Sequence, residues 1–145
     1  MKSEKGVTLL SLALYILIAT IAIGILAMIS SNFFFNARKV KSQNEYAEEF
    51  NKFNMFFIQD VKNNKTAVVT DTTVTFEDGN IYTYNESNKC ILRNETIIAK
   101  NVQALKYTAG TYEVNTLIKN LITVNMNIGN NNLFQKEIEY VLKYW

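Results

Sequence analysis

The chain has 145 residues, of which 48% are hydrophobic and 19% are charged, so it is long enough for one compact domain and one accessory element. The net charge of +2 is too small to indicate a nucleic-acid partner, because such proteins concentrate Lys and Arg on one face. With no histidine and one cysteine, the chain lacks the atoms for His-based acid–base catalysis, for zinc sites of His or Cys, and for an internal disulfide. We therefore expect no enzyme activity, no cofactor and no metal.

The first predicted element is a membrane-spanning helix over residues 7–36. No charged side chain occurs between Gly6 and Ala37, and the run from Val7 to Ile29 is almost wholly apolar. At about 1.5 Å per residue this run is roughly 34 Å long, which matches a hydrocarbon core of about 30 Å. A removed secretory signal would have a shorter apolar region followed by small residues, and is the weaker interpretation. An ordinary membrane anchor fits the same length.

The residues before this helix, 1–6, form a short charged leader. The leader reads MKSEKG, and the helix then begins VTLLSL. A charged leader that ends in Lys-Gly, followed by an apolar residue, Thr-Leu-Leu and an unbroken apolar helix, resembles the class III signal of type IV prepilins. The resemblance implies that a membrane-embedded prepilin peptidase cuts between Gly6 and Val7 and methylates the new amine of Val7. Glycine suits this position, because a backbone without Cβ can lie extended and close to a protease.

Ser11 departs from the pattern of that family. Most members carry a glutamate at the fifth mature position, where its carboxylate pairs with the N-terminal amine of a neighbouring subunit, and Ser11 stands there in this chain. A charge in hydrocarbon is costly unless it is paired, so the glutamate recruits and registers an incoming subunit, which Ser11 cannot do. Members without the acid tend to be minor subunits at a filament tip or in assembly initiation. The chain also lacks the proline that usually kinks the helix of major pilins.

Charge counting leaves the orientation of the predicted membrane helix open. Basic residues flank it on both sides: Lys2 and Lys5 before it, and Arg38, Lys39 and Lys41 after it. The positive-inside rule is therefore ambiguous. The prepilin resemblance implies a single-pass protein of the cytoplasmic membrane with an extracytoplasmic head, residues 37–145, carried on a filament or the cell surface after assembly.

An amphipathic continuation of the helix is predicted over residues 37–62. Apolar residues recur there at spacings of three, four or seven, which indicates one buried stripe: Ala37, Val40, Ala47, Phe50, Phe53, Phe57 and Val61. Charged and amide side chains fill the other face. We expect this half of the helix to support a β-rich region, residues 66–145.

From Thr66 the hydrophobic period changes to two, and turn residues separate the apolar runs. Four short strands are predicted: Val74 to Phe76, Ile81 to Tyr84, Cys90 to Arg93 and Thr96 to Ala99. Asp78-Gly79 predicts a tight hairpin turn between the first two, so the region forms an antiparallel meander. In its apolar run, Cys90 is predicted to be a small buried hydrophobe.

The C-terminal part is predicted to add further strands. Val102 to Thr108 and Thr111 to Val114 flank Ala109-Gly110 and predict a second hairpin. A strong alternation from Leu121 to Ile128 and a terminal strand within Leu133 to Trp145 follow. One face of the sheet is expected to pack on the apolar stripe of the helix. The predicted fold class is α+β, with a long N-terminal helix on a mainly antiparallel sheet, in the pilin-like order.

Three runs in the head, Val74 to Tyr84, Cys90 to Arg93 and Val102 to Tyr107, look most similar to J-type minor pseudopilins and their competence-pilus relatives. The resemblance implies a minor pilin or pseudopilin of a type IV pilus, a type II secretion-like system or a competence filament. Its implied partners are the prepilin peptidase, other major and minor pilins, the inner-membrane assembly platform and membrane lipid.

Two other functions stay open at this point. A DNA-uptake pilin with a nucleic-acid-binding head belongs to the same family, although Glu and Asp interleave with Lys throughout the head and form no basic stripe. A membrane-anchored enzyme would need paired carboxylates in the absence of histidine. Glu137 and Glu139 are the only close pair on one strand face, and such a pair is usually solvated.

Overall fold

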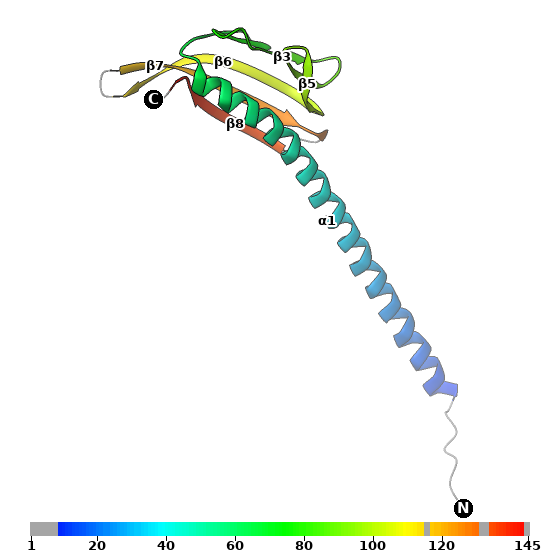
Figure 1. Cartoon of the computed structure of the whole chain (residues 1–145). Coiled ribbons are helices and arrows are strands. Elements are labelled where there is room, and N and C mark those ends of the chain that lie inside the picture. Colours follow the sequence, from blue (N-terminus) through cyan, green and yellow to red (C-terminus); the bar gives the residue numbers. More distant parts are fainter. Residues whose placement is uncertain (1–8, 115–116, 131–133, 144–145) are drawn as a thin grey trace, which may run out of the picture. The chain divides into compact units, whose positions relative to one another are not determined.

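The computed structural model describes residues 9–114, 117–130 and 134–143. The chain separates into two compact units, residues 1–41 and residues 42–145. Helix α1 runs from Leu9 to Asn63 and contributes to both units (Figure 1). No proline or glycine, the two residues of poorest helix propensity, occurs between Gly24 and the end of this helix. The predicted end of the helix at about Lys62 is confirmed.

The first sheet of the second unit is an antiparallel meander of five strands in chain order. Its strands are β1 (Ala67–Val69), β2 (Thr73–Phe76), β3 (Ile81–Asn85), β4 (Cys90–Arg93) and β5 (Thr96–Lys100). The meander predicted from the turn residues is confirmed, and β1 is an additional strand. The predicted turn at Asp78-Gly79 lies between β2 and β3. Gly79 has a φ of 89° there, which glycine adopts without strain. Cys90 is buried, also as predicted.

The second sheet has three antiparallel strands in chain order, so the described part of the head contains two sheets where one was expected. Its strands are β6 (Val102–Val114), β7 (Leu117–Ile128) and β8 (Phe134–Val141). In the second part of β7, alternate residues on one face, Ile122, Val124, Met126 and Ile128, are all buried. The alternation predicted for this strand is therefore confirmed.

The hairpin turn predicted at Ala109-Gly110 is wrong. Strand β6 continues through both residues to Val114, and Gly110 pairs with Leu121 of β7. The positive-φ glycines of the described residues are Gly79 and Gly129, so Gly110 does not use the conformational freedom that suggested a turn. A methyl group at Gly110 would meet the side chain of Leu121 at 3.5 Å, an ordinary contact. This glycine is an extended residue inside a long strand.

The core of the second unit lies between the end of α1 and the two sheets. The stripe of α1 contributes Phe50, Phe53, Phe57 and Val61, all buried, whereas Ala37 and Val40 at its start are exposed. The ring of Phe57 lies at the centre of an aromatic cluster. Its centroid is 4.9 to 6.1 Å from five other rings, those of Phe53, Phe76, Tyr82, Tyr107 and Tyr140. Edge-to-face and stacked pairs of this kind stabilise a core beyond their buried area.

Two close contacts fix the helix against the sheets. Gly129, after β7, has a φ of 80°, and a Cβ there would lie 2.2 Å from the ring of Tyr46, so only glycine allows this approach. At the other end, the buried Asn64 side chain accepts a hydrogen bond from the backbone of Asp78 at 3.0 Å and donates one to its carboxylate at 3.0 Å. The end of α1 is thereby tied to the β2–β3 turn.

Candidate functional site

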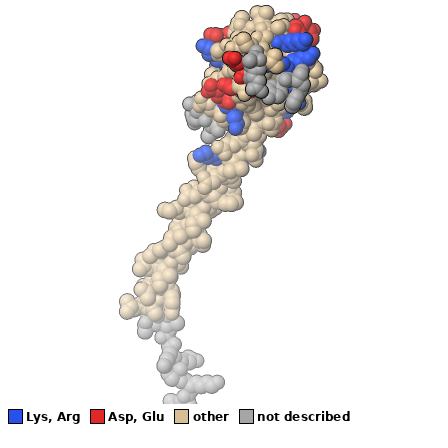
Figure 2. All heavy atoms as spheres, turned by 90° about the vertical axis from the view of Figure 1, so that its left-hand side faces the viewer, with Lys and Arg blue, Asp and Glu red and all other residues tan. Residues whose placement is uncertain are grey.

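The described part of the first unit is an apolar helical segment with no interior of its own. From Leu9 to Asn36 it contains no acidic or basic residue, and its large apolar side chains are exposed, Leu9 by 87% and Leu12 by 51%. Its mean hydropathy reaches 2.7 over an 18-residue window, none of which is buried. In Figure 2 this segment is uniformly free of charged side chains, whereas residues of both signs are scattered over the head. Among the described residues, α1 is the one helix long and apolar enough to cross a membrane.

The processing and assembly residues predicted from the sequence are Gly6, Val7 and Ser11. Gly6 and Val7 are outside the described residues. Ser11 lies in the first turns of α1 and is half-buried. Thr20 illustrates how a hydroxyl is accommodated in this segment, because its Oγ1 donates a hydrogen bond to the carbonyl of Leu17 at 2.8 Å. A hydroxyl can thus be satisfied by the helix itself, whereas a carboxylate in hydrocarbon needs an external cation.

Asp60 is the most buried charged residue of the described head, with 2% of its surface exposed. It accepts two hydrogen bonds from the guanidinium of Arg93, at 2.8 and 3.0 Å, and one from the hydroxyl of Tyr82 at 2.5 Å. The Asn80 amide donates a longer one at 3.3 Å. Burial and the bond to Asp60 raise the pKa of Tyr82, and the bond to Asp60 raises the pKa of Arg93. Tyr82 therefore stays neutral and Arg93 stays charged, and the Asp60 side chain connects α1 to β3 and β4.

Sequence reasoning missed this buried carboxylate. Asp60 follows Phe57 by three residues and directly precedes Val61, so it lies inside the apolar stripe that the pattern otherwise identifies. An acid at a stripe position indicates a buried ion pair, because burial of a lone charge is too costly. The spacing could have revealed Asp60, but nothing in the sequence identifies Arg93, which lies 33 residues away, as its partner.

The carboxylate pair on β8 does not form an enclosed site. Glu137 and Glu139 are both exposed, and they lie opposite Asn125 and Thr123 of β7. Glu137 accepts one long hydrogen bond from the Asn125 amide at 3.5 Å. Within residues 9–114, 117–130 and 134–143, no group of three His, Cys, Asp or Glu side chains could hold a metal ion. The candidate functional elements are therefore the apolar segment and the surfaces of the head.

The fold defines a class of architecture: one long apolar N-terminal helix joined to an α+β head of antiparallel sheets, which is compatible with pilin-like proteins. Comparison of the chain with protein-family models, with curated proteins and with solved structures gives no significant match.

Proposed function

We propose that this chain is a minor pilin or pseudopilin that acts in assembly initiation or at the tip of a type IV pilus, a type II secretion-like system or a competence filament. The observation that carries the proposal is the division of α1. Its first half is uncharged, apolar and unburied, and its second half contributes a buried aromatic stripe to a β-rich head. A helix of this kind anchors a subunit in the membrane and offers an apolar surface for packing against the helices of other subunits.

The leader supports the proposal. Cleavage between Gly6 and Val7 by a prepilin peptidase would release residues 1–6 and leave Val7 as an N-methylated end. The charged residues of the leader would then be absent from the mature subunit, whose helix begins with uncharged residues as far as Ala37. The charge left at the start of the mature helix would be that of the Val7 amine, so this amine is the group there that needs an acidic partner when the subunit moves from the membrane into a filament.

Ser11 supports the assignment to a minor subunit. A carboxylate at this position would attract the amine of a neighbouring subunit strongly, because both charges lie in a medium of low dielectric. A serine hydroxyl provides no comparable attraction when the chain docks on an existing filament end. The chain can still present its own Val7 amine to the acid of another subunit, so we place it in few copies beside major and minor pilins and the inner-membrane assembly platform, with the head outside the cytoplasmic membrane.

The experiment is mass spectrometry of this chain in cells that carry the assembly machinery, from both the membrane fraction and sheared filaments. We expect a mature chain that starts at methylated Val7 and is present at a small fraction of the major subunit. A strain with an inactive prepilin peptidase is the control and should retain Met1. Retention of Met1 beside an active peptidase would leave a plain membrane anchor, and a copy number near that of the major subunit would exclude a minor role.

A further inference from the structure

The strands β6 and β7 extend past the end of α1 (Figure 1). On β7, the residues that face the core are Ile122, Val124, Met126 and Ile128, all buried. Ile118 lies on the same face by alternation, yet 71% of its surface is exposed. The helix ends at Asn63 and does not reach this residue. An apolar position of the core face is therefore open at this end of the head.

The backbone edge of β7 is also open beside Ile118. Strand β6 pairs with β7 along its whole length, but β8 pairs with it only from Leu121 to Ile128. Beyond this pairing, a backbone hydrogen bond joins the Leu142 N–H to the carbonyl of Asn120, at 2.9 Å. Lys143 has a φ of 36°, and its N–H donates a hydrogen bond to the carbonyl of Val61 at the end of α1. Ile118 is two residues before Asn120, so its N–H and C=O point toward the same edge, where no described strand pairs with it.

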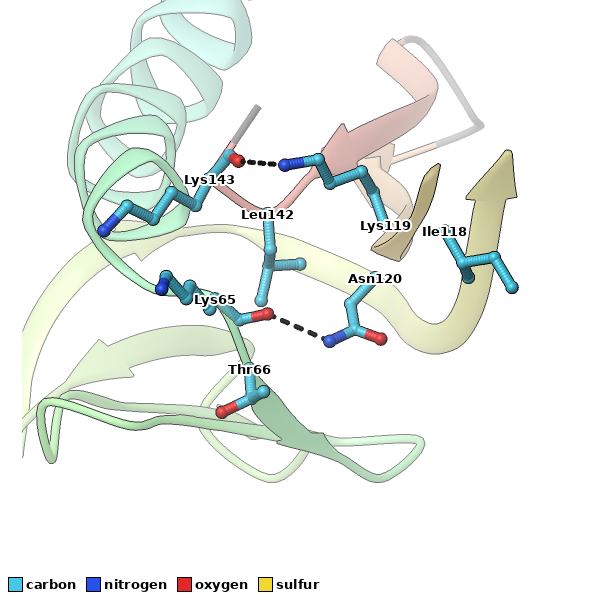
Figure 3. Close-up of a pocket in the computed structure, with 7 residues that line it drawn as sticks. All are labelled: Lys65, Thr66, Ile118, Lys119, Asn120, Leu142 and Lys143. Atoms are coloured by element: carbon cyan, nitrogen blue, oxygen red, sulfur yellow. Dashed lines mark hydrogen bonds between the residues drawn. The ribbon is translucent and has the colours of Figure 1, made fainter. Parts of the chain in front are cut away.

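A cavity of about 500 Å³ lies where β8 ends, and lysines line it. Figure 3 shows Ile118, Lys119 and Asn120 on the β7 side, Leu142 and Lys143 at the end of β8, and Lys65 and Thr66 after the helix. Lys119 Nζ donates to the carbonyl of Lys143 at 3.2 Å, and the Asn120 amide donates to the carbonyl of Lys65 at 2.9 Å. Neither bond neutralises a lysine.

The balance of charge at this cavity is positive. The three ammonium groups form no ion pair among the described residues, and no carboxylate belongs to the lining. Glu77 accepts hydrogen bonds from the Lys65 N–H and the Thr66 hydroxyl, and these bonds together with the charge of Lys143 lower its pKa. Glu113 pairs with Ile118 across the hairpin. The cavity therefore combines one exposed apolar side chain, an open strand edge and an excess of positive charge.

We propose that this notch, defined as the open edge of β7 at Ile118 with Lys65, Lys119 and Lys143, docks an extended acidic segment of another protein as an added strand. Main-chain hydrogen bonds to an exposed edge provide affinity in such complexes, and the side chains of alternate residues provide specificity. Lysines on an edge discourage pairing with most strands. The same lysines favour a strand that carries carboxylates, which is how charge complementarity selects a partner.

In Figure 3 the ammonium groups of Lys65 and Lys143 lie on the helix side of the cavity, and that of Lys119 points toward the Lys143 carbonyl. The three groups do not converge on one point, which favours a polypeptide over a small anion. Ile118 adds an apolar contact that a phosphate or a nucleic-acid backbone would not use. The segment that fits therefore has carboxylates on both sides of an apolar residue. The proposal holds for any partner protein and does not depend on the assignment to a filament.

The experiment measures binding of a fluorescein-labelled, end-capped peptide, Asp-Val-Glu-Val-Asp, to the full chain in detergent micelles by fluorescence anisotropy. We expect saturable binding that falls about tenfold or more in the double variant Lys119→Glu with Lys143→Glu, because both charges would then repel the peptide. The matched control is Lys136→Glu, which reverses the charge of an exposed lysine elsewhere, on β8. It should bind the peptide with the same affinity as the unchanged chain. Circular dichroism should show that all variants remain folded.

Two further probes separate strand addition from simple charge attraction. A version of the peptide with alternate amides N-methylated keeps its charge but loses main-chain donors, and should bind about tenfold more weakly or not at all. An oligothymidylate of equal charge should not compete. Absence of saturable binding, equal binding of the methylated peptide, or full competition by the oligonucleotide would overturn the proposal. So would self-association of the unchanged chain that the double variant abolishes, because the edge would then belong to a second copy.

Discussion

The two halves of α1 have the same helical backbone but differ in the burial, the apolar pattern and the charge of their side chains. From Leu9 to Lys41 no residue is buried, and the large apolar side chains all lie exposed. From Ser42 to Asn63 the buried apolar residues form one stripe, of which Phe53 and Phe57 are completely buried, whereas Met55 outside the stripe is 61% exposed. The second half also carries charges, including a buried one at Asp60. The first half of the helix therefore exposes apolar side chains that require an apolar environment such as a membrane. The second half buries its apolar stripe against the two sheets of the head.

This difference shows that hydrophobicity alone does not identify a core. The first half is the more apolar of the two and contributes nothing to the packing of the head, whereas the second half stabilises the head with fewer apolar residues at regular spacing. The following predictions test that contrast, beginning with the largest expected effect. Each compares variants of the full chain in detergent micelles.

The largest effect is expected for a pair of matched phenylalanines. Phe57→Ala removes a ring that contacts five others and should destabilise the head by about 4 kcal/mol, through lost burial and the cavity left behind. Phe34→Ala removes the same ring from the first half, where Phe34 is 60% exposed, and should leave head unfolding unchanged. Urea titration followed by near-UV circular dichroism measures both. An equal loss for Phe34→Ala would show that the two halves unfold as one cooperative unit.

A somewhat smaller effect is expected at the buried acid. Asp60→Ala removes the partner of Arg93 and Tyr82 and should destabilise the head by about 3 kcal/mol. The loss is less than for a fully buried pair, because the Arg93 side chain is 27% exposed and can be rehydrated. Asp71→Ala is the control, since Asp71 is largely exposed and its contact with Lys106 is 3.6 Å long. If both variants lose the same stability, the buried network contributes no more than a surface pair.

Much of the fold could be predicted from sequence because its patterns are local. The stripe from Phe50 to Val61, the Asp78-Gly79 turn and the alternation along β7 each depend on residues close together in the chain, and the structure agrees with all of them. The turn at Gly110 was wrong because glycine signals a turn only where a positive φ is needed. The division into two sheets was missed because it depends on long-range pairing, which local periodicity does not contain.

The candidate sites were less predictable than the fold. The leader junction at Gly6 and Val7 and the position of Ser11 come from sequence, and they remain predictions. The open edge at Ile118 could not be predicted, because it depends on where β8 stops pairing and where α1 ends, and the alternation alone marks Ile118 as a core residue. Contacts such as Asp60 with Arg93 likewise require three-dimensional proximity of distant residues.

The smallest expected difference is between two tyrosines that pack on the same helix stripe. Tyr82 and Tyr107 are both almost fully buried, and both rings contact Phe57. The Tyr82 hydroxyl donates to Asp60, whereas the Tyr107 hydroxyl has no hydrogen-bond partner among the described residues. Tyr82→Phe should therefore cost about 1–3 kcal/mol, because a buried carboxylate loses a donor.

Tyr107→Phe removes a buried hydroxyl that is desolvated without compensation, so its stability should be unchanged or raised by about 1 kcal/mol. The two variants delete the same atom from the same kind of ring, so their difference isolates the hydrogen bond from the packing. Thermal unfolding of both variants, measured in parallel with the unchanged chain, provides the comparison. A loss for Tyr107→Phe as large as that for Tyr82→Phe would mean that the Tyr107 hydroxyl also has a hydrogen-bond partner, such as a buried water. Both tyrosines that pack on Phe57 would then be held by a polar contact as well as by their rings.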